Sequence, residues 1–330
     1  MSRSPPRWPR APCSSVSVMR FVVCGEALID LMPEDEISPE ESRWIARSGG
    51  GPMNTAVALA KLGEDTHFLG RLSTDSFGRQ LESHLATAGV QLDLAVTTSD
   101  LTSVAVVSLD QQGKASYTFH FHDTSNFNWA ADEFPTLGDD DWLHFGSIGS
   151  VIGPGARRVL DFVNRTDAVC SYDINVRPSC LPDRAEYFAL VSDLMRAVGR
   201  NAGIVKASDE DIVWLVDDED NALDYAAAWV EEFDLSLFIV TLGADGVAAV
   251  RRDGTVVKVP GLSVEVVDTV GAGDTFMAGF LSAYTADPSD IAAALARGAA
   301  AAAVVVTRKG AKPPTRAELD AFAAGNRPAS

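Results

Sequence analysis

The chain has 330 residues, of which 46% are hydrophobic, and this is enough for a substantial core in one large domain or two. A formal net charge of −19 argues against a nucleic-acid partner, because binding along a phosphate backbone depends on many clustered lysines and arginines. The four cysteines are too few and too scattered for a disulfide framework, so we expect a reducing compartment, the cytoplasm.

The first 18 residues differ in composition from the rest of the chain. They contain three arginines, four prolines and no acidic residue. A transit peptide has a similar composition, but the prolines disfavour the amphipathic helix that such a peptide forms. Because Met19 begins a segment typical of a first β-strand, we interpret residues 1–18 as a start-site extension or a disordered tail. Residues 19–330 then form the folded domain.

Strands and helices alternate from Met19 onward. Residues 19–32, "MRFVVCGEALIDLM", are typical of a buried strand that breaks at Gly25, and "NTAVALAKLG" (54–63) has the apolar spacing of a helix that ends at a glycine. Residues 65–73 predict another strand, and residues 75–90 predict a helix from near Asp75 to Gly89. This alternation indicates successive βα units.

Residues 102–121 have a different pattern, with two β-rich arms around the polar turn "DQQGK". This predicts a hairpin rather than a crossover. Together with residues 32–47, the hairpin could form a small sheet apart from the main one, so that the lid segments are roughly 32–47 and 100–122. The exposed edge of such a sheet could pair with a second copy of the chain, which would give a homodimer.

The second half of the chain again alternates between strands and helices. Strands are predicted at 141–147, 168–175, 202–208, 237–243 and 246–260, and helices at 184–199 and 222–233. The alanine-rich segment 291–306 contains Arg297 and predicts a buried helix, not a membrane span. We therefore expect an α/β fold with a mainly parallel central sheet, helices on both faces and no association with a membrane.

The segment "VVDTVGAGD" (266–274) carries the clearest chemical signal in the sequence. Ligands of α/β folds collect where the parallel strands end and helices begin. Gly271 and Gly273 can adopt backbone angles that direct successive N–H groups toward one point, and the helix predicted after them adds the positive end of its dipole. Gly271, Ala272 and Gly273 therefore predict an anion hole.

Asp274 follows this turn directly. The helix dipole would keep its carboxylate ionised, and the carboxylate could then accept a proton from a nearby hydroxyl while the N–H groups hold the charge on a transferred phosphoryl group. The alternative is that Asp274 is only the N-cap of the helix. Spacing alone does not separate these two interpretations.

Three motifs together resemble the ribokinase-like sugar kinases, the PfkB family. "DTVGAGDTFMAGFL" resembles the C-terminal signature of this family, "SGGGPMNTAVALAKLG" resembles its glycine-rich sugar-binding segment, and "GRLSTDSFG" resembles the stretch that follows. The resemblance extends from about Met19 to Pro314, in the expected order. It implies a ribokinase-like fold with a small β-sheet lid, ATP and Mg²⁺ as cofactors, Asp274 as the catalytic base and residues 271–273 as the anion hole.

The resemblance also implies roles for individual residues. The implied sugar-binding residues are Asp30, Gly50, Gly51, Asn54 and Arg177. Each charged or amide side chain of this set has an alternative interpretation: a turn carboxylate for Asp30, a helix cap for Asn54 and a surface salt bridge for Arg177. The implied nucleotide-binding residues are Ser208, Thr241, Gly243 and Gly246, for which a plain β-turn at 243–246 is the alternative.

Metal sites are implied at two places. Asp211 occupies the position of a family glutamate that influences magnesium, although a solvated helix start is an alternative for it. Asp268, Val270 and Gly310 match a monovalent-cation site, which implies K⁺. Ala299 stands where many members have Asn or His, so we expect no polar contact with adenine from this side chain.

Several features resemble fructokinases in particular, among them "GEALIDLMP" and "DINVRPS". His120 and His122 stand where related kinases place an aromatic residue and often an arginine, and no arginine occurs between Lys114 and Arg157. This favours a neutral sugar such as fructose over 2-keto-3-deoxygluconate. The alternatives are a kinase for ribose or 2-keto-3-deoxygluconate, or a non-catalytic relative that binds a sugar or nucleotide. A nicotinamide-dependent dehydrogenase is disfavoured, because no G-x-G-x-x-G follows the first strand.

Overall fold

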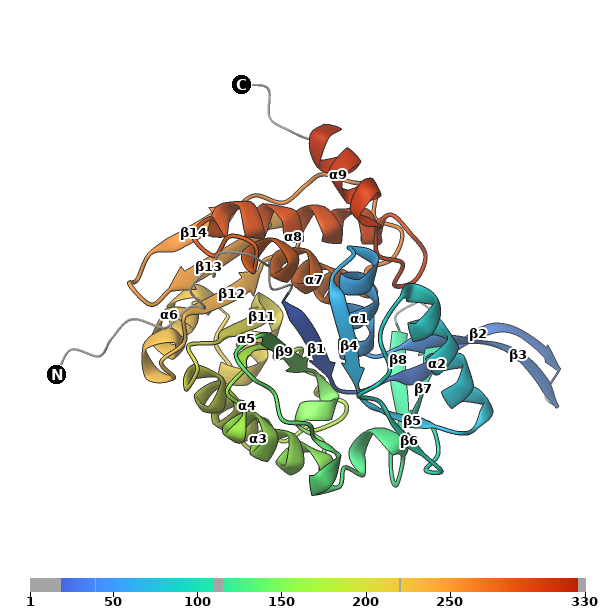
Figure 1. The fold of residues 1–330 in the computed structure, drawn as a ribbon. Coiled ribbons are helices and arrows are strands. Elements are labelled where there is room, and N and C mark those ends of the chain that lie inside the picture. Colours follow the sequence, from blue (N-terminus) through green and yellow to red (C-terminus); the bar gives the residue numbers. More distant parts are fainter. Residues whose placement is uncertain (1–18, 39, 110–114, 220, 326–330) are drawn as a thin grey trace.

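A computed structural model describes residues 19–38, 40–109, 115–219 and 221–325. The N-terminal segment 1–18 and the polar turn predicted at 110–114 therefore lie outside the described residues. An eight-stranded sheet forms the centre of the fold (Figure 1), in the order β14-β13-β12-β11-β10-β9-β1-β4. Its strands are β1 (Arg20–Cys24), β4 (Asp65–Leu69), β9 (Asp141–Gly146), β10 (Val169–Asp173), β11 (Ile204–Ser208), β12 (Leu237–Thr241), β13 (Val247–Arg251) and β14 (Val256–Val259).

Within this sheet the neighbouring strands β4, β1, β9, β10, β11 and β12 are parallel to one another. Strands β13 and β14 add an antiparallel edge. The predicted mainly parallel sheet is therefore confirmed. The carboxyl ends of β10, β11 and β12 lie at one edge of the sheet, at Asp173, Ser208 and Thr241. Loops that leave this edge are the usual place for ligands in such folds.

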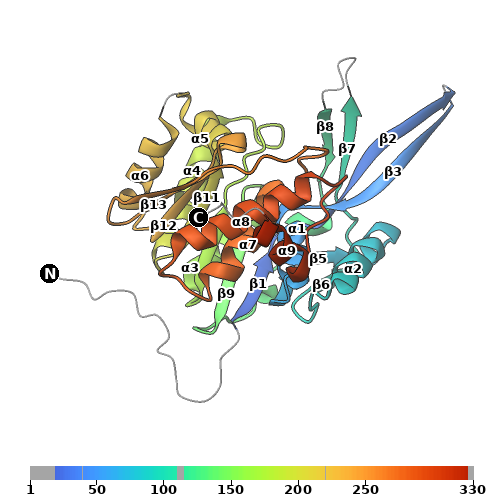
Figure 2. The same ribbon diagram turned by 90° about the horizontal axis from the view of Figure 1, so that it is seen from above.

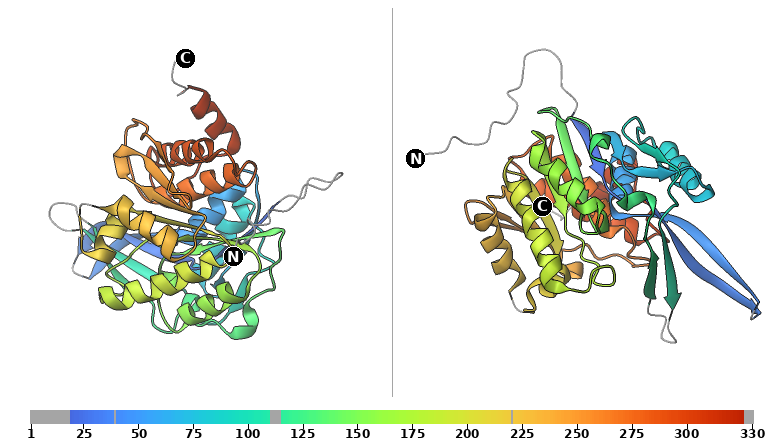
Figure 3. Two further views of the ribbon diagram at one scale, coloured as in Figure 1. Left: turned by 90° about the vertical axis from the view of Figure 1, so that its left-hand side faces the viewer. Right: turned by 90° about the horizontal axis from the view of Figure 1, so that it is seen from below.

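Helices cover both faces of the sheet, as Figure 2 and the right-hand view of Figure 3 show. One group comprises α1 (Gly51–Lys61), α2 (Ser76–Ala88), α7 (Ala272–Tyr284), α8 (Ile291–Val306) and α9 (Arg316–Gly325). The other comprises α3 (Gly155–Arg165), α4 (Arg184–Gly199), α5 (Asp209–Val216) and α6 (Ala222–Glu232). Phe21 and Val23 pack with the first group, and Val22 and Cys24 pack with the second. The alternation of side chains along a strand thus supplies both cores.

A second, four-stranded sheet projects from one side of the molecule (Figure 2). Its order is β3-β2-β7-β8, built from β2 (Leu28–Ser38), β3 (Glu41–Gly49), β7 (Val104–Leu109) and β8 (Ala115–His120). The break predicted at Gly25 within residues 19–32 is confirmed, and it separates β1 and β2, which belong to different sheets. The chain turns between them at Gly25, whose φ is +151°, where a Cβ atom would lie 2.4 Å from the ring of Pro52.

Local sequence signals set the ends of the helices. The Asp75 carboxylate accepts a hydrogen bond from Gly78 N at 2.7 Å and caps α2, which ends at Gly89 with φ of +92°. Both ends were predicted. Helix α1 begins at Gly51 rather than at Asn54, because Pro52 is tolerated in the first turn of a helix. In the part of the chain that the structure describes, no helix is long and apolar enough to cross a membrane.

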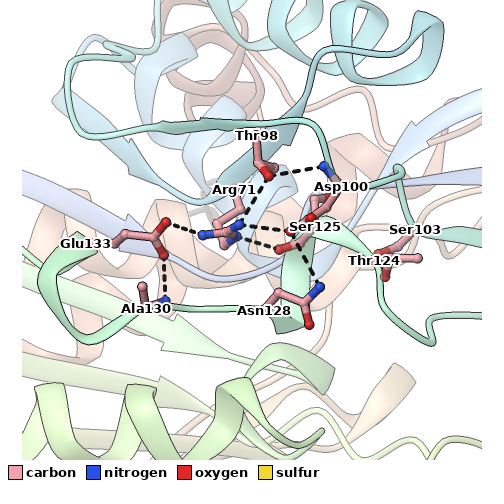
Figure 4. A network of polar contacts seen from close by, with 9 residues as sticks. All are labelled: Arg71, Thr98, Asp100, Ser103, Thr124, Ser125, Asn128, Ala130 and Glu133. Carbon is pink, nitrogen blue, oxygen red and sulfur yellow. Dashed lines mark hydrogen bonds and ion pairs between the residues drawn. The ribbon is translucent and has the colours of Figure 1, made fainter.

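A buried arginine anchors the base of the small sheet (Figure 4). Arg71, in β5 (Arg71–Ser73), donates to the Ser125 carbonyl at 3.0 Å, pairs with Asp100 at 2.9 Å and also pairs with Glu133. Strand β5 pairs with β6 (Val96–Thr98), and short 3₁₀ turns lie at η1 (Ser125–Phe127), η2 (Ala131–Glu133), η3 (Ile148–Ser150) and η4 (Gly243–Asp245). The network therefore fixes η1. The Asn126 side chain in turn bonds both the N–H and the carbonyl of Ala27 between β1 and β2, at 3.1 and 2.9 Å.

Candidate active site

Two cavities meet at the turn that precedes α7. The smaller has a volume of about 340 Å³ and lies between the small sheet and the central sheet, and the larger has a volume of about 660 Å³ and lies over β11, β12 and α8. Thr269, Ala272 and Gly273 line both cavities. A group bound in one cavity can therefore approach a group bound in the other across this turn.

The structure brings the sequence-predicted residues together around these cavities. The smaller cavity is lined by Asp30, Gly50, Gly51, Asn54, Arg177, Val270, Gly271, Ala272, Gly273 and Asp274. The larger cavity is lined by Ser208, Thr241, Gly243 and Gly246, together with Ala299. The residues predicted for the sugar and those predicted for the nucleotide thus lie on opposite sides of one turn.

The start of α7 presents free backbone donors. Gly271 is its N-cap, with φ of +77°, and a Cβ atom there would lie 2.7 Å from that of Ala311. The Ala272 N–H donates to the Thr269 carbonyl at 3.2 Å. Among the described residues, the N–H groups of Gly271, Gly273 and Asp274 donate to no backbone carbonyl. These three donors, more than that of Ala272, can hold an anion.

Asp274 is the third residue of α7 and is 9% exposed. Its Oδ2 accepts a hydrogen bond of 2.9 Å from Nδ2 of Asn54, the fourth residue of α1. The N-cap interpretation of Asp274 and the helix-cap interpretation of Asn54 are therefore both wrong. A Cβ atom at Gly51 would lie 3.3 Å from Asp274 Oδ1, so the glycine keeps the space beside this oxygen open.

The pKa of Asp274 is raised to about 6. Burial is the main cause and the Asp173 carboxylate adds to it, whereas the hydrogen bond from Asn54 and the cations Lys206 and Arg177 oppose the rise. The expectation that the helix dipole governs this carboxyl is therefore corrected, since removal from water is the larger effect. At neutral pH the group is still mainly ionised. A carboxyl with a pKa near the working pH is well suited to accept a proton from a hydroxyl.

Asp30 lies on β2, opposite Arg47 of β3 and Ala105 of β7, and not in a turn. Burial raises its pKa to about 6, opposed by the charges of Arg177 and Arg47. A Cβ atom at Gly49 would lie only 2.5 Å from Asp30 Oδ2. The first glycine of "GGG" therefore makes room for this side chain, a role that the sequence alone did not reveal.

Glu26 is a site residue that was not predicted. It is 1% exposed, and its carboxylate accepts hydrogen bonds from Gly149 N at 3.0 Å and from Gly51 N at 3.3 Å. Burial raises its pKa to about 7. At Gly50, with φ of +117°, a Cβ atom would lie 2.5 Å from the Glu26 carbonyl oxygen. The glycine run thus packs around Glu26.

Two aromatic residues of β8 were also missed. Tyr117 and Phe119 line the smaller cavity and stack with ring centroids 5.9 Å apart. The two-residue period of a strand could have placed them on one face, with His120 on the other. His120 is exposed and His122 pairs with Asp123 outside the cavity, so neither histidine lines it.

Arg177 follows β10 and lines the smaller cavity. Its Nη1 donates to the Val176 carbonyl at 2.9 Å, and its backbone N–H donates to the Tyr187 hydroxyl at 3.2 Å. Within the described ranges the guanidinium group has no ion-pair partner. The salt-bridge interpretation is therefore not supported, and the cation is free to contact a ligand.

Asp211, predicted for magnesium, forms a capping box with Ser208, predicted for the nucleotide. The Ser208 hydroxyl accepts from Asp211 N at 3.0 Å, and the Asp211 carboxylate accepts from Ser208 N and from Val176 N, both at 2.8 Å. Asp211 is buried, so the solvated alternative is wrong. Among the residues that the structure describes, no group of three or more His, Cys, Asp or Glu could hold a metal.

The residues predicted for a monovalent cation also lie together. The Asp268 carboxylate accepts from Val270 N at 3.1 Å and from Gly310 N at 2.8 Å. Gly310 has φ of +75°. These bonds join the loop before α7 to the loop after α8, next to the turn that separates the two cavities.

Comparisons with known proteins agree with this geometry. The sequence profile described as "pfkB family carbohydrate kinase" matches residues 19–318. A fructokinase of Rhizobium leguminosarum bv. trifolii is 35% identical over 271 residues, which are 81% of this chain and 80% of the relative.

Solved structures are similar over almost the whole chain. The fructokinase of Vibrio cholerae O395 with fructose, ADP and calcium ion bound has a TM-score of 0.80 at 29% identity, over 93% of this chain and 99% of the other. A double mutant of that enzyme was solved with fructose, ADP and potassium ion, and has a TM-score of 0.81 at 28% identity, over 94% and 99%. The fructokinase of Xylella fastidiosa with bound ATP has a TM-score of 0.81 at 26% identity, over 93% and 99%.

Proposed function

Because the chain belongs to the pfkB family of carbohydrate kinases, we propose that it transfers the γ-phosphoryl group of ATP to a primary hydroxyl of fructose. The observation that carries the proposal is the shared turn: Ala272 and Gly273 line both the cavity that contains Asp30 and the cavity that contains Thr241. The sugar would lie in the first cavity and ATP in the second. Positioning of this kind can supply about 7–11 kcal/mol of a barrier.

In this proposal Asp274 is the general base. Its carboxylate accepts the proton of the attacking hydroxyl, a contribution worth roughly 10²- to 10⁴-fold in rate. Asn54 holds the carboxylate in place through the bond of 2.9 Å to Oδ2. The N–H groups at the start of α7 stabilise the negative charge of the phosphoryl group in transfer.

Other side chains would bind the sugar. Asp30 can accept hydrogen bonds from sugar hydroxyls, and the exposed guanidinium group of Arg177 can donate to the sugar or to the phosphate. Tyr117 and Phe119 of the small sheet lie over the same cavity. Closure of this sheet as a lid would exclude water, which otherwise competes as the phosphoryl acceptor.

Metal ions would assist on the nucleotide side. Mg²⁺ bound to the ATP phosphates would neutralise their charge, near Asp211. The bonded set of Asp268, Val270 and Gly310 would hold K⁺, and the double mutant of the Vibrio cholerae O395 fructokinase was solved with potassium ion bound.

The small sheet also supports a homodimer. Trp44 and Ile45 on β3, the outermost strand of that sheet, are 43% and 36% exposed. Pairing with a second copy would cover this edge. Sedimentation of the purified protein tests this proposal, since a single species at the mass of one chain would contradict it.

A coupled assay for ADP release tests the activity. Purified protein is offered ATP and Mg²⁺ with fructose, ribose, 2-keto-3-deoxygluconate or nucleosides, each at several concentrations. We expect the highest kcat/KM with fructose. A higher value with ribose or 2-keto-3-deoxygluconate would replace fructose as the substrate, and no sugar-dependent ADP release would leave only a binding role.

A further inference from the structure

A buried ion pair lies next to the start of α7. Lys206 on β11 and Asp173 at the end of β10 are opposite each other in the parallel register and are 4% and 5% exposed. The Lys206 ammonium donates to both oxygens of Asp173, at 3.0 and 3.1 Å. None of the roles proposed above involves this pair.

The ammonium group sits directly behind the turn that separates the two cavities. A Cβ atom at Gly273 would lie 2.9 Å from Lys206 Nζ and 3.9 Å from Asp173 Oδ2. Asp173 lines the smaller cavity, whereas Lys206 lies behind it. Only glycine at position 273 allows a buried cation to come this close to the first turn of α7.

The surroundings of Asp274 are strongly charged. The groups that act on it are Asn54 from α1, Glu26 from the segment after β1, Asp173 from β10, Arg177 from the segment after β10, and Lys206 from β11. Two of these are acidic and two are cationic. Arg177 is exposed, so water weakens its field, while Lys206 is buried and its field is screened much less.

We propose that Lys206 is a positioning residue of this kinase: its ammonium group, anchored by Asp173, keeps the Asp274 carboxylate ionised beside two other acidic side chains. It also adds positive charge behind the phosphoryl-binding turn. The inference rests on the proposed role of Asp274 as the base. Lys206 itself stays protonated at neutral pH: burial lowers its pKa, but the carboxylates of Asp173 and Asp211 outweigh this effect and raise it.

Direct removal of Lys206 would leave Asp173 buried without a partner, and such a carboxyl tends to take up a proton. The effect of Lys206 is therefore best measured where position 173 is already neutral and where Asp211 still favours the protonated ammonium group. The two variants to compare are Asp173→Asn and Asp173→Asn with Lys206→Met. Lys258→Met on β14 serves as a control, because this lysine is exposed and lines neither cavity. For each variant, kcat/KM for fructose is measured from pH 5 to 9, together with the Tm.

We expect the acid limb of the pH profile to lie about one pH unit or more higher in the double variant than in Asp173→Asn. At pH 5, below both limbs, a displacement of one unit corresponds to a roughly tenfold lower kcat/KM. A role in packing alone would change the Tm or the plateau of the profile, but it would leave the two limbs at the same pH. Coincident limbs would overturn the inference.

If Asp173→Asn does not fold, the same comparison is made with serine at position 173, as Asp173→Ser and Asp173→Ser with Lys206→Met, and an upward displacement of the limb is expected again. An unmoved limb in that comparison would overturn the inference. Asp274→Asn, assayed in parallel, separates this result from the proposed function. Turnover that survives in Asp274→Asn would refute the general base, whereas its loss together with coincident limbs would refute only the role of Lys206.

Discussion

The two cavities that meet at residues 271–273 are lined by different kinds of residues. The smaller cavity, the proposed sugar side, is lined by carboxylates that are wholly or partly withdrawn from water, namely Glu26, Asp30, Asp173 and Asp274. The larger cavity, the proposed nucleotide side, is lined largely by small residues and backbone, including Gly243, Gly246, Ala299, Ala302 and Ala303. One side offers positioned charge, and the other offers space and amide groups.

This difference predicts different kinds of damage. A substitution on the sugar side changes a charge or moves a carboxylate, and it should reduce kcat or the affinity for the sugar. A substitution on the nucleotide side fills space, and it should weaken ATP binding while the chemistry remains intact. The predictions below test this contrast in order of decreasing effect.

The largest effect is expected from Asp274→Asn. The amide keeps the shape of the side chain but cannot accept the proton of the hydroxyl, so we expect kcat to fall by roughly 10²- to 10⁴-fold. Binding of fructose, measured by calorimetry without ATP, should change only a few-fold. A kcat within a factor of ten of wild type would contradict the assignment of the base.

Gly49→Ala should act through Asp30. The new Cβ atom would lie 2.5 Å from Asp30 Oδ2, so the carboxylate must move. Since small displacements of a positioning group are costly, we expect kcat/KM for the sugar to fall on the order of 10- to 100-fold, with the KM for ATP unchanged. Gly138→Ala is the matched control, because a Cβ atom there would meet nothing within 4 Å.

Gly246→Ala tests the nucleotide side. Gly246 has φ of +104°, and a Cβ atom would lie 2.2 Å from the Val259 carbonyl oxygen, so the turn must shift. We expect the KM for ATP to rise roughly tenfold, which corresponds to about 1.4 kcal/mol, without a change in fructose binding.

Gly254→Ala controls for backbone strain in this comparison. Gly254 has φ of +81°, but a Cβ atom there would have no neighbour within 4 Å. This variant should therefore leave the KM for ATP unchanged. Equal effects of the two substitutions would show that strain, and not contact with the nucleotide turn, is the cause.

The sequence could predict the features that depend on neighbouring residues in the chain. The Gly271–Gly273 turn, Asp274 and the order of strands and helices follow from local composition and spacing, so they were found. The role of Arg71 was not found, because its partners Ser125 and Glu133 are 54 and 62 residues away in sequence. Pairings of that kind depend on the tertiary fold, and no local pattern indicates them.

The site was predicted with the same limits. Asp30 and Asn54 were expected to bind the sugar, and both line the smaller cavity. The sequence alone did not decide between this role and a turn carboxylate for Asp30 or a helix cap for Asn54. Glu26 and Lys206 were missed because each lies in a run typical of a buried strand or its end, where a charged residue has meaning only through neighbours from other strands. The direction of the pKa shift of Asp274 was missed for the same reason, since it depends on burial.

The last prediction concerns stability and not activity, and it uses Asp274→Asn again. The pKa of Asp274 rises from 3.8 to about 6 in the folded protein, mainly through burial. The folded state therefore binds this proton more tightly than the unfolded state. The contribution of this group to stability is fully present below pH 3.8 and is lost as the pH rises through 6.

Asparagine cannot ionise, so the variant should avoid that loss. At 1.36 kcal/mol per pKa unit, we expect it to be more stable than wild type by about 1–3 kcal/mol at pH 7, with a Tm several degrees higher. Near pH 4 the two proteins should unfold at nearly the same temperature, because the wild-type carboxyl is then protonated in the folded state. A gap in Tm that does not depend on pH would instead reflect altered packing around Asn54. A difference in Tm that grows as the pH rises, together with the loss of turnover, would show that the ionised carboxylate needed for activity destabilises the fold.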